Sequence, residues 1–461
     1  MSTQKSARSL GIQWGVSLLL TLACYVIPEQ GIYTHQVKLF LTITVFSLAL
    51  AAFELVPNLV VAVVMSGFWI VAGVSDIATV MSSWTTPTML MLIGAFFISA
   101  SLEDSGLLKR VAFYLMCKVK GNYFALLMSL MVVSILLNIL TFGNAYVIMP
   151  PLALGLCISL NGMKKKLGAG IAAAVMLGCA TSHAYTYHVA AWGVISQLGA
   201  PFLGDDVVTP FSIIIHNWPL FIISVILLWI VSKWYKPEED LGDIAYFRQH
   251  LAKMGPISRR EKANAVVLGV LLLYSFTVNL TGLDLNYGFA LIPFALFLPF
   301  INGATQQTVE KVNFEMLFFV AACMAIGTVA TNMGLGDAIA EACLKALGGN
   351  TSPMLIIAII FGIVFILNFL MTPMAIWSLI TIPLLTMVTN LGFSALPFAY
   401  AINACAEAII MPYEYVPYLV IFSFGMISMK DFVVFNIVRS IVVLLGIVVV
   451  LTGYWHLIGL M

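Results

Sequence analysis

Four ionisable side chains stand within otherwise apolar parts of the sequence: His183, His188, Glu407 and Glu414. Ionisable groups at membrane depth are costly in free energy and typically mark the path of an ion or a proton. Histidine titrates near neutral pH, and a glutamate removed from water can titrate in the same range. We therefore predict that one or more of these residues carries a coupling proton. The alternative is a set of buried structural residues that hydrogen-bond to neighbouring hydroxyl or backbone groups.

Two similar hydrophobic stretches are each interrupted by a few small or polar residues. Residues 134–151 read SILLNILTFGNAYVIMPP, and residues 365–383 read FILNFLMTPMAIWSLITIP. Each limb has roughly 12 to 16 residues, whereas a hydrocarbon core of about 30 Å needs about 20 helical residues. Broken backbone persists at membrane depth only where protein buries it or where water or substrate reaches it. We therefore predict two re-entrant helical hairpins, at 124–160 and 353–390, whose tips bind the substrate.

The predicted substrate-binding residues come from the hairpin tips and from the runs that hold the ionisable residues. They are Thr141, Gly143, Asn144, Thr372, Pro373, Met374, His188, Tyr415 and Pro417. The candidates for cation coupling are His183, His188, Glu407, Glu414 and Asn144. A sodium site is predicted near the oxygen atoms of Thr141, Asn144 and Thr372. The expected coupling ion is sodium or a proton, and no other cofactor is expected.

The composition excludes a soluble globular protein. Hydrophobic residues make up 62% and charged residues 9% of the 461 residues, with a mean hydropathy of +1.05. The formal net charge of +1 leaves no basic surface for nucleic acid. The sequence has no GxxxxGK[ST] phosphate loop, no HExxH motif and no GxSxG motif, so we expect neither an ATP-driven protein nor an enzyme. The expected partners are the lipid bilayer and a small molecule.

The apolar runs predict an all-α polytopic membrane protein with about eleven transmembrane helices besides the two hairpins. Two runs are too long for one plain crossing: residues 167–198, which have a polar middle, and residues 396–426, which are interrupted at 412–417. We expect each to be unwound near its centre. Residues 107–119 are predicted to lie as a helix in the membrane interface, and residues 287–301 to form a crossing.

The two halves of the chain resemble each other at a shift of about 228 to 230 residues, which pairs Asn138 with Asn368. An odd number of crossings between the copies makes them inverted repeats. The predicted divisions are a first span at 1–36, a first repeat at 37–232, a charged cytoplasmic connector at 233–262 and a second repeat at 263–461. The first hairpin then opens from the cytoplasm and the second from outside.

The distribution of basic residues predicts the orientation. With a cytoplasmic N-terminus, almost all lysines and arginines of the loops fall on the cytoplasmic side, and Arg439 lies near that same end. The C-terminus then lies outside. We expect a multi-pass protein of the plasma (inner) membrane.

Two motifs and their order resemble a known family. Glu54-Leu-Val-Pro57 is followed by Gly94-Ala-Phe-Phe-Ile-Ser-Ala-Ser-Leu-Glu103-Asp-Ser-Gly106-Leu-Leu-Lys-Arg110, a hairpin, a broken span and a second hairpin. This pattern resembles the divalent anion:sodium symporter (DASS, INDY-like) family of the ion transporter superfamily. The resemblance implies a homodimer with a scaffold domain and an elevator-like transport domain. It also implies symport of dicarboxylates, tricarboxylates or sulfate with sodium.

The sequence departs from that family at the tips. Family members carry Ser-Asn-Thr at each tip, where this chain has Thr141-Phe142-Gly143 and Pro373-Met374-Ala375. The resemblance therefore supports the architecture more strongly than it supports the sodium sites or the dicarboxylate specificity.

These observations predict a secondary active transporter of a small organic anion, a dicarboxylate or other carboxylate, coupled to sodium or protons. Helix N-termini at the tips favour an anion, because their free N–H groups and dipoles attract negative charge. Two alternatives remain open. One is a cation/proton antiporter or efflux permease of the same superfamily, and the other is a membrane scaffold or sensor that transports nothing.

Overall fold

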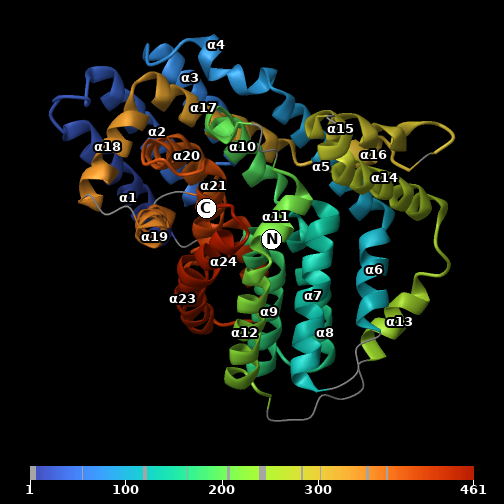
Figure 1. The fold of residues 1–461 in the computed structure, drawn as a ribbon. Helices are drawn as coiled ribbons and strands as arrows, with labels where there is room; N and C mark the ends of the chain where they lie inside the picture. Colours follow the sequence, from blue (N-terminus) through green and yellow to red (C-terminus); the bar gives the residue numbers. More distant parts are fainter. Residues whose placement is uncertain are drawn as a thin grey trace. The chain divides into compact units, whose positions relative to one another are not determined.

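The computed structural model describes residues 7–53, 55–117, 122–163, 165–204, 208–237, 245–281, 284–301, 303–348, 352–369 and 372–461. Regular structure in these residues is helical, which confirms the predicted all-α class (Figure 1). Glu54 of the family-like motif lies outside the described residues. The chain folds into two compact units, each built from separated stretches of sequence. Unit 1 holds residues 1–89, 194–205 and 313–402, and unit 2 holds residues 90–193, 206–312 and 403–461.

Several helices are long and apolar enough to cross a membrane, which confirms the polytopic membrane class. Within the described residues there are six, or seven if α11 (Pro210–Asn217) and α12 (Pro219–Trp234), bent by 63° at their junction, form one span. The six are Pro87–Ser105, Tyr123–Thr141, Lys166–Leu203, Phe314–Asn332, Pro373–Asn390 and Met429–Leu457. Shorter apolar helices accompany them, and the total of about eleven crossings stays a prediction.

Unit 1 is organised around α17 (Phe314–Asn332), which packs against α3 (Asn58–Val71) and α20 (Pro373–Asn390). From Leu317 to Ala330 nearly every side chain of α17 is buried, as expected of a helix that is apolar all round. The other helices of this unit are α1 (Ala7–Val26), α2 (His35–Ala52), α4 (Ile77–Val80), the 3-10 turn Ser82–Thr85, α18 (Leu335–Leu347), α19 (Pro353–Asn368) and most of α21 (Ala395–Ala406).

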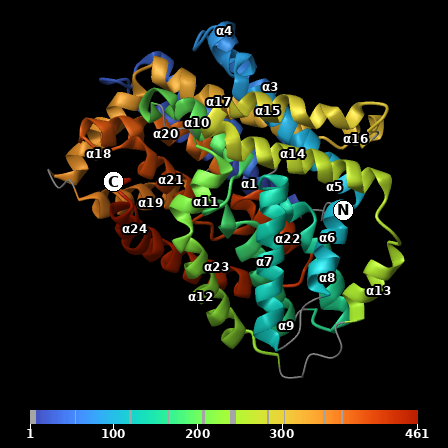
Figure 2. The same ribbon diagram turned by 45° about the vertical axis from the view of Figure 1, so that its right-hand side comes forward.

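Unit 2 is organised around α9 (Lys166–Cys179), which contacts helices on several sides (Figures 1 and 2). Its neighbours are α7 (Tyr123–Thr141), α8 (Met149–Ser159), α12, α22 (Val416–Ser423) and α23 (Met429–Leu445). Every residue of α9 from Leu167 to Cys179 is buried, and many are glycine or alanine. Small residues let helices approach closely inside a membrane. A Cβ on Gly178, for example, would lie 2.4 Å from the Ser134 Cβ of α7.

The remaining helices of unit 2 frame this bundle. They are α5 (Pro87–Ser105), α6 (Leu107–Met116), α10 (Val189–Leu203, which continues into unit 1), α11, α13 (Ala245–Lys253), α14 (Arg259–Thr281), α15 (Leu285–Leu291), the 3-10 helix Ile292–Phe297, α16 (Gln306–Glu310), the π-helix Gly446–Leu451 and α24 (Thr452–Leu457).

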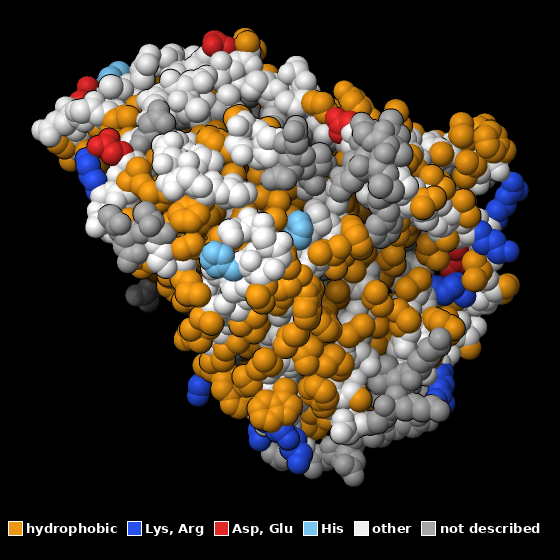
Figure 3. Space-filling view, viewed as in Figure 1, with side chains coloured by type: hydrophobic (Ala, Val, Ile, Leu, Met, Phe, Trp, Pro, Cys, Tyr) orange, Lys and Arg blue, Asp and Glu red, His pale blue; other side chains and the backbone are white. Residues whose placement is uncertain are grey.

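The face formed by α12 and α23 is hydrophobic over its whole length (Figure 3). Exposed apolar side chains recur at helical spacing along both helices: Phe221, Ile222, Ile226 and Trp229 on α12, and Val434, Ile437, Ile441 and Leu445 on α23. Lys233 marks the polar end of α12. An apolar band that ends in a cation is what a lipid-facing surface requires.

The range predicted for the first hairpin contains α7, a break at 142–144, the 3-10 turn Ala145–Val147 and α8. Helices α19 and α20 span the range predicted for the second. The predicted limb length of roughly 12 to 16 residues was wrong for α7 and α20, which have 19 and 18 residues, whereas α19 has 16. Thr141 was interpreted as part of the first break, but it is helical.

Two other predicted elements can be compared with the structure. The helix predicted at 107–119 is α6, whose buried Leu108, Ala112 and Phe113 face protein, since α6 contacts α7 and α13, while its position in the membrane interface stays a prediction. The crossing predicted at 287–301 is a short helix, α15, followed by a 3-10 helix with Pro293 in its first turn. Proline lacks the N–H group that a continuous α-helix needs.

Candidate functional site

Both long runs are unwound near the predicted places. The first leaves α-helical geometry after Cys179, passes through the 3-10 turn Thr181–Ala184 and resumes α-helical geometry at Val189. The second is non-helical from Glu407 to Met411 and passes through the 3-10 turn Pro412–Glu414 before α22 begins. The second break therefore starts five residues earlier than predicted. Both breaks belong to unit 2, as does the tip of the first hairpin.

The first break is tied to the hairpin tip by Asn138. Its amide nitrogen donates hydrogen bonds to Gly178 O, Cys179 O and Ser182 Oγ, at 3.1, 2.9 and 2.8 Å. Its amide oxygen accepts a hydrogen bond from Ala145 N at 3.0 Å, across the tip. One fully buried side chain thus satisfies backbone groups that the break and the tip would otherwise leave unpaired. Asn138 is a structural residue of both elements.

The tip itself is shaped by a left-handed turn. Phe142 has φ +52° and Gly143 has φ +104°, and the Phe142 carbonyl accepts a hydrogen bond from Val189 N at 3.0 Å. A Cβ on Gly143 would lie 2.2 Å from the His188 ring. Only glycine fits at this position, so the tip and the first break are in direct contact.

His183 is the centre of a buried polar cluster. Its Nε2 lies 3.1 Å from Gly143 O, and its Nδ1 lies 3.3 Å from Glu407 Oε1 and 3.2 Å from the Tyr415 hydroxyl. The same hydroxyl lies 3.4 Å from His188 Nδ1. The two imidazole rings stack with their centroids 4.3 Å apart and an angle of 6° between their planes. The hairpin tip and the two breaks therefore meet at one side chain.

Burial makes this cluster electrostatically demanding. His183 and Glu407 are 0% and 1% exposed. Within the described residues, neither carboxylate oxygen of Glu407 has a hydrogen-bond donor of good geometry apart from its approach to His183. A buried carboxylate without donors is strongly disfavoured unless a positive charge or a proton neutralises it.

Glu414 has a different environment. Its carboxylate accepts hydrogen bonds from the backbone N–H groups of Ile410 and Met411, at 2.9 and 3.1 Å. Glu414 therefore stabilises its own loop, which is the structural role that the alternative interpretation of these ionisable residues predicts.

Several other predicted site residues stabilise the local backbone conformation. Thr141 Oγ1 donates to Leu137 O and accepts from Asn144 N, and the Asn144 amide donates to Thr141 O. Pro417 lies in the first turn of α22, where its missing N–H costs nothing.

Thr372, Pro373 and Met374 belong to unit 1. Thr372 precedes α20, Pro373 begins it and Met374 is buried in it. Residues 370 and 371 lie outside the described residues. The predicted pocket between the two tips, and the sodium site that uses Thr372, therefore stay predictions.

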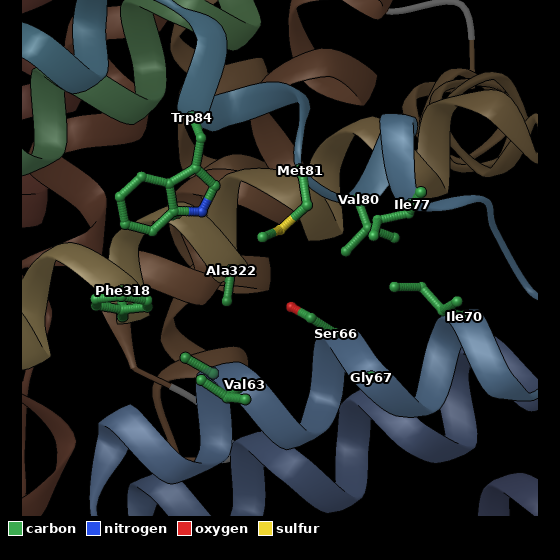
Figure 4. Close-up of a pocket in the computed structure, with 12 residues that line it drawn as sticks. Val63, Ser66, Gly67, Ile70, Ile77, Val80, Met81, Trp84, Phe318 and Ala322 are labelled. Carbon is green, nitrogen blue, oxygen red and sulfur yellow. The ribbon is translucent and has the colours of Figure 1, made fainter.

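Unit 1 also contains a separate cavity of about 220 Å³ between α3, α4 and α17 (Figure 4). Its lining is apolar apart from Ser66 and the Trp84 ring nitrogen, and it includes none of the predicted site residues. Ser66 alone among the lining residues carries a hydroxyl. Nothing in this cavity resembles a site for a charged solute.

Sequence reasoning missed Arg439. It was interpreted as a marker of the cytoplasmic end of the last span, but the structure places it in the interior of unit 2, 0% exposed, against both breaks. The available signal was its position as the only charged residue in the apolar run 432–451. Asn403 was also missed, and its amide donates to His183 O at 2.9 Å.

Broken helices whose unwound segments converge on buried ionisable groups are typical of polytopic membrane transporters. A family model described as "CitMHS: Citrate transporter" matches residues 48–404. The chain therefore belongs to this citrate transporter family and is a multi-span membrane transporter. The match ends three residues before Glu407, so Glu407, Glu414 and Arg439 lie beyond it.

Two solved transporters share the fold. The YdaH transporter of Alcanivorax borkumensis, described as having an unusual topology, has a TM-score of 0.56 at 19% identity, covering 83% of this chain and 88% of its own. MtrF of Neisseria gonorrhoeae, described with a class of antimetabolite efflux pumps, has a TM-score of 0.57 at 15% identity, covering 95% and 97%. No curated protein gives a significant sequence match. Family and fold together confirm the class of transporter that the sequence resembles.

Proposed function

We propose that this protein is a proton-coupled secondary transporter of a small organic anion, with a carboxylate such as citrate as the substrate class. The matched family supports the substrate class, and the cluster around His183 supports the proton. The proposed location is the plasma (inner) membrane with the N-terminus in the cytoplasm.

The distances around His183 support a proton between its ring and Glu407. Gly143 O can only accept, so His183 Nε2 carries a hydrogen and donates it there. In a neutral ring, Nδ1 would then be an acceptor that faces a carboxylate oxygen 3.3 Å away, which is repulsive. A proton on Nδ1 or on Glu407 turns this contact into a hydrogen bond. That geometry is the observation on which the proposal depends.

The same proton links the charge of the His183 cluster to the hairpin tip and the second break. Because His183 contacts the hairpin tip through Gly143 O and the second break through Glu407, loss of the proton weakens the contact between these elements. A local charge change can bias an element with two positions. The protonated cluster also presents no net negative charge to an incoming anion.

The test is uptake of labelled citrate and other carboxylates into proteoliposomes, with pH and sodium gradients imposed separately. We expect wild-type uptake to follow the pH gradient alone. Glu407→Gln should abolish pH-driven accumulation but keep exchange of labelled for unlabelled substrate, because an amide can still donate to Nδ1 but cannot release a proton. Glu341→Gln, on an exposed side chain, is the control.

Two results would contradict the proposal: accumulation driven by sodium alone, or pH-driven accumulation that survives in Glu407→Gln. The likeness to MtrF favours efflux as a second candidate function. The same vesicles, loaded with substrate and given an external acid pulse, distinguish the two, because an efflux exchanger would export substrate as protons enter.

A further inference from the structure

Arg439 is a fully buried cation whose hydrogen-bond partners are all neutral. One guanidinium nitrogen, Nη2, donates to Ile409 O at 2.8 Å, and the other, Nη1, donates to the Tyr418 hydroxyl and lies 3.4 Å from Thr181 Oγ1. The Ser440 hydroxyl lies 3.5 Å from Nη2. Among the described residues, no carboxylate forms an ion pair with this side chain.

These oxygen atoms come from both unwound segments. Thr181 belongs to the first break, Ile409 to the second, and Tyr418 to the helix that follows the second. The Thr181 and Tyr418 hydroxyls are 3.2 Å apart, and the guanidinium carbon lies 4.8 Å from the centroid of the Tyr418 ring. Arg439 therefore joins the two breaks from α23.

Carbonyl and hydroxyl oxygens freed by broken helices are the ligands with which transporters hold a monovalent cation. Here the Arg439 guanidinium, which is part of the chain, is the cation that such oxygens bind. Glu414, an acid of the same loop, binds the N–H groups of Ile410 and Met411 and so stabilises the loop from its other side. The loop therefore lies between the Arg439 guanidinium and the Glu414 carboxyl group.

We propose that Arg439 is a tethered cation that fills, between the two breaks, a monovalent-cation position, so that the breaks are held together without a sodium ion. The role of Arg439 in transport rests on the proposed function. It deepens that function, because it explains why a proton alone serves as the coupling ion. It also makes a separate claim about cation binding, which can be tested without transport.

The test removes the tether and supplies the cation in solution. Purified Arg439→Ala in detergent should unfold at a lower temperature than wild type, and millimolar guanidinium or sodium should raise its melting temperature, with choline chloride as the ionic-strength control. Wild type should not respond. In proteoliposomes, uptake by Arg439→Ala should fall about tenfold or more, because charge-assisted hydrogen bonds are lost, and the same cations should restore it.

Arg439→Gln serves as a second variant, because glutamine can still donate to Ile409 O if the alanine variant does not fold. A folded variant that is impaired but that no cation restores overturns the proposal, as does a neutral variant that is as stable and active as wild type. Failure of both variants to fold even with guanidinium present also overturns it. If the proposed function were wrong, uptake by the wild-type protein would not respond to the pH gradient.

Discussion

Gly143 is the residue at which a single added atom should do most damage to the site. Its φ of +104° is unfavourable for any residue with a side chain, and a Cβ would lie 2.2 Å from His188 Cδ2 and 3.1 Å from His188 Cα. The backbone of the first break, and not only a flexible ring, would have to move. Since His183 and His188 stack, that movement would also disturb the contact between His183 and Glu407.

We therefore predict that Gly143→Ala lowers the free energy of unfolding by about 2 kcal/mol or more and removes pH-driven uptake. Melting temperature in detergent and proteoliposome uptake measure the two effects. Gly362→Ala, in α19, is the matched control, because no atom lies within 4 Å of its added Cβ. Normal uptake by a stably folded Gly143→Ala variant would show that the tip and His188 do not need to touch.

At the scale of elements, the position of the first break depends on how closely α9 approaches α7. Gly178 lies where the two helices touch, with Ser134 Cβ at 2.4 Å and Met131 O at 2.6 Å from its ideal Cβ. The next carbonyls, Gly178 O and Cys179 O, accept from Asn138, so a shift of α9 would also stretch those bonds. Close packing and the hydrogen-bond network are thus coupled.

Gly178→Ala should therefore cost about 1 to 3 kcal/mol of stability, the usual range for an overpacked interior. It should also reduce transport without changing which gradient drives it, because no ionisable group is altered. Thermal unfolding and uptake under the two separate gradients give the measurements. Gly453→Ala, in α24, has no atom within 4 Å of the new Cβ and should be neutral. Equal stability of the two variants would show that α9 and α7 can separate at no cost.

The sequence was informative about elements wherever polarity interrupts an apolar run. Both unwound segments and the region of both predicted hairpins were found in this way, because such interruptions have few physical explanations inside a membrane. Limb length was misjudged because Thr141 is polar yet helical: its hydroxyl donates to Leu137 O on its own helix. Polarity alone does not separate a helix break from a helical residue with a partner.

The sequence could not show which side chains of the candidate site contact one another. His183 and Glu407 were both identified as candidates, but nothing in their spacing joins them or sets Glu414 apart. That separation depends on which backbone N–H groups the second break leaves free, and Glu414 binds two of them. Arg439 was misplaced because a basic residue in an apolar run was counted as a loop marker. Its partners come from three other segments, and only the fold brings these together.

At the scale of the whole chain, one arginine binds several groups in the C-terminal part of the connector predicted at 233–262. Arg110 of α6 donates to Glu261 at 2.7 Å and to the carbonyls of Met254, Gly255 and Pro256 at 3.2, 2.8 and 3.3 Å. Glu261 also accepts from Ser258 N at 2.6 Å. Residues 254–261 are therefore held as a defined structure at the polar start of α14, before the apolar part of that helix.

This fastening should depend on pH with a predictable sign. Burial alone would raise the pKa of the Glu261 carboxyl, but the hydrogen bonds from Arg110 and Ser258 lower it below its usual value. A carboxyl whose pKa is lower in the folded state stabilises the fold above its unfolded pKa of about 4.3, and this contribution is lost as the pH falls through the folded pKa. The contribution is therefore complete at pH 6 to 8.

We predict that Glu261→Gln lowers the melting temperature at pH 7 and that its difference from wild type shrinks steadily below about pH 4.3. Glu341→Gln, which removes an exposed pair with Lys345, should change the melting temperature little at any pH, because surface ion pairs contribute about 0 to 1 kcal/mol. Melting curves of the three proteins from pH 3 to 8 test this. If the Glu261→Gln difference were constant across that range, the charge of Glu261 would contribute nothing, and the backbone contacts of Arg110 would hold the connector by themselves.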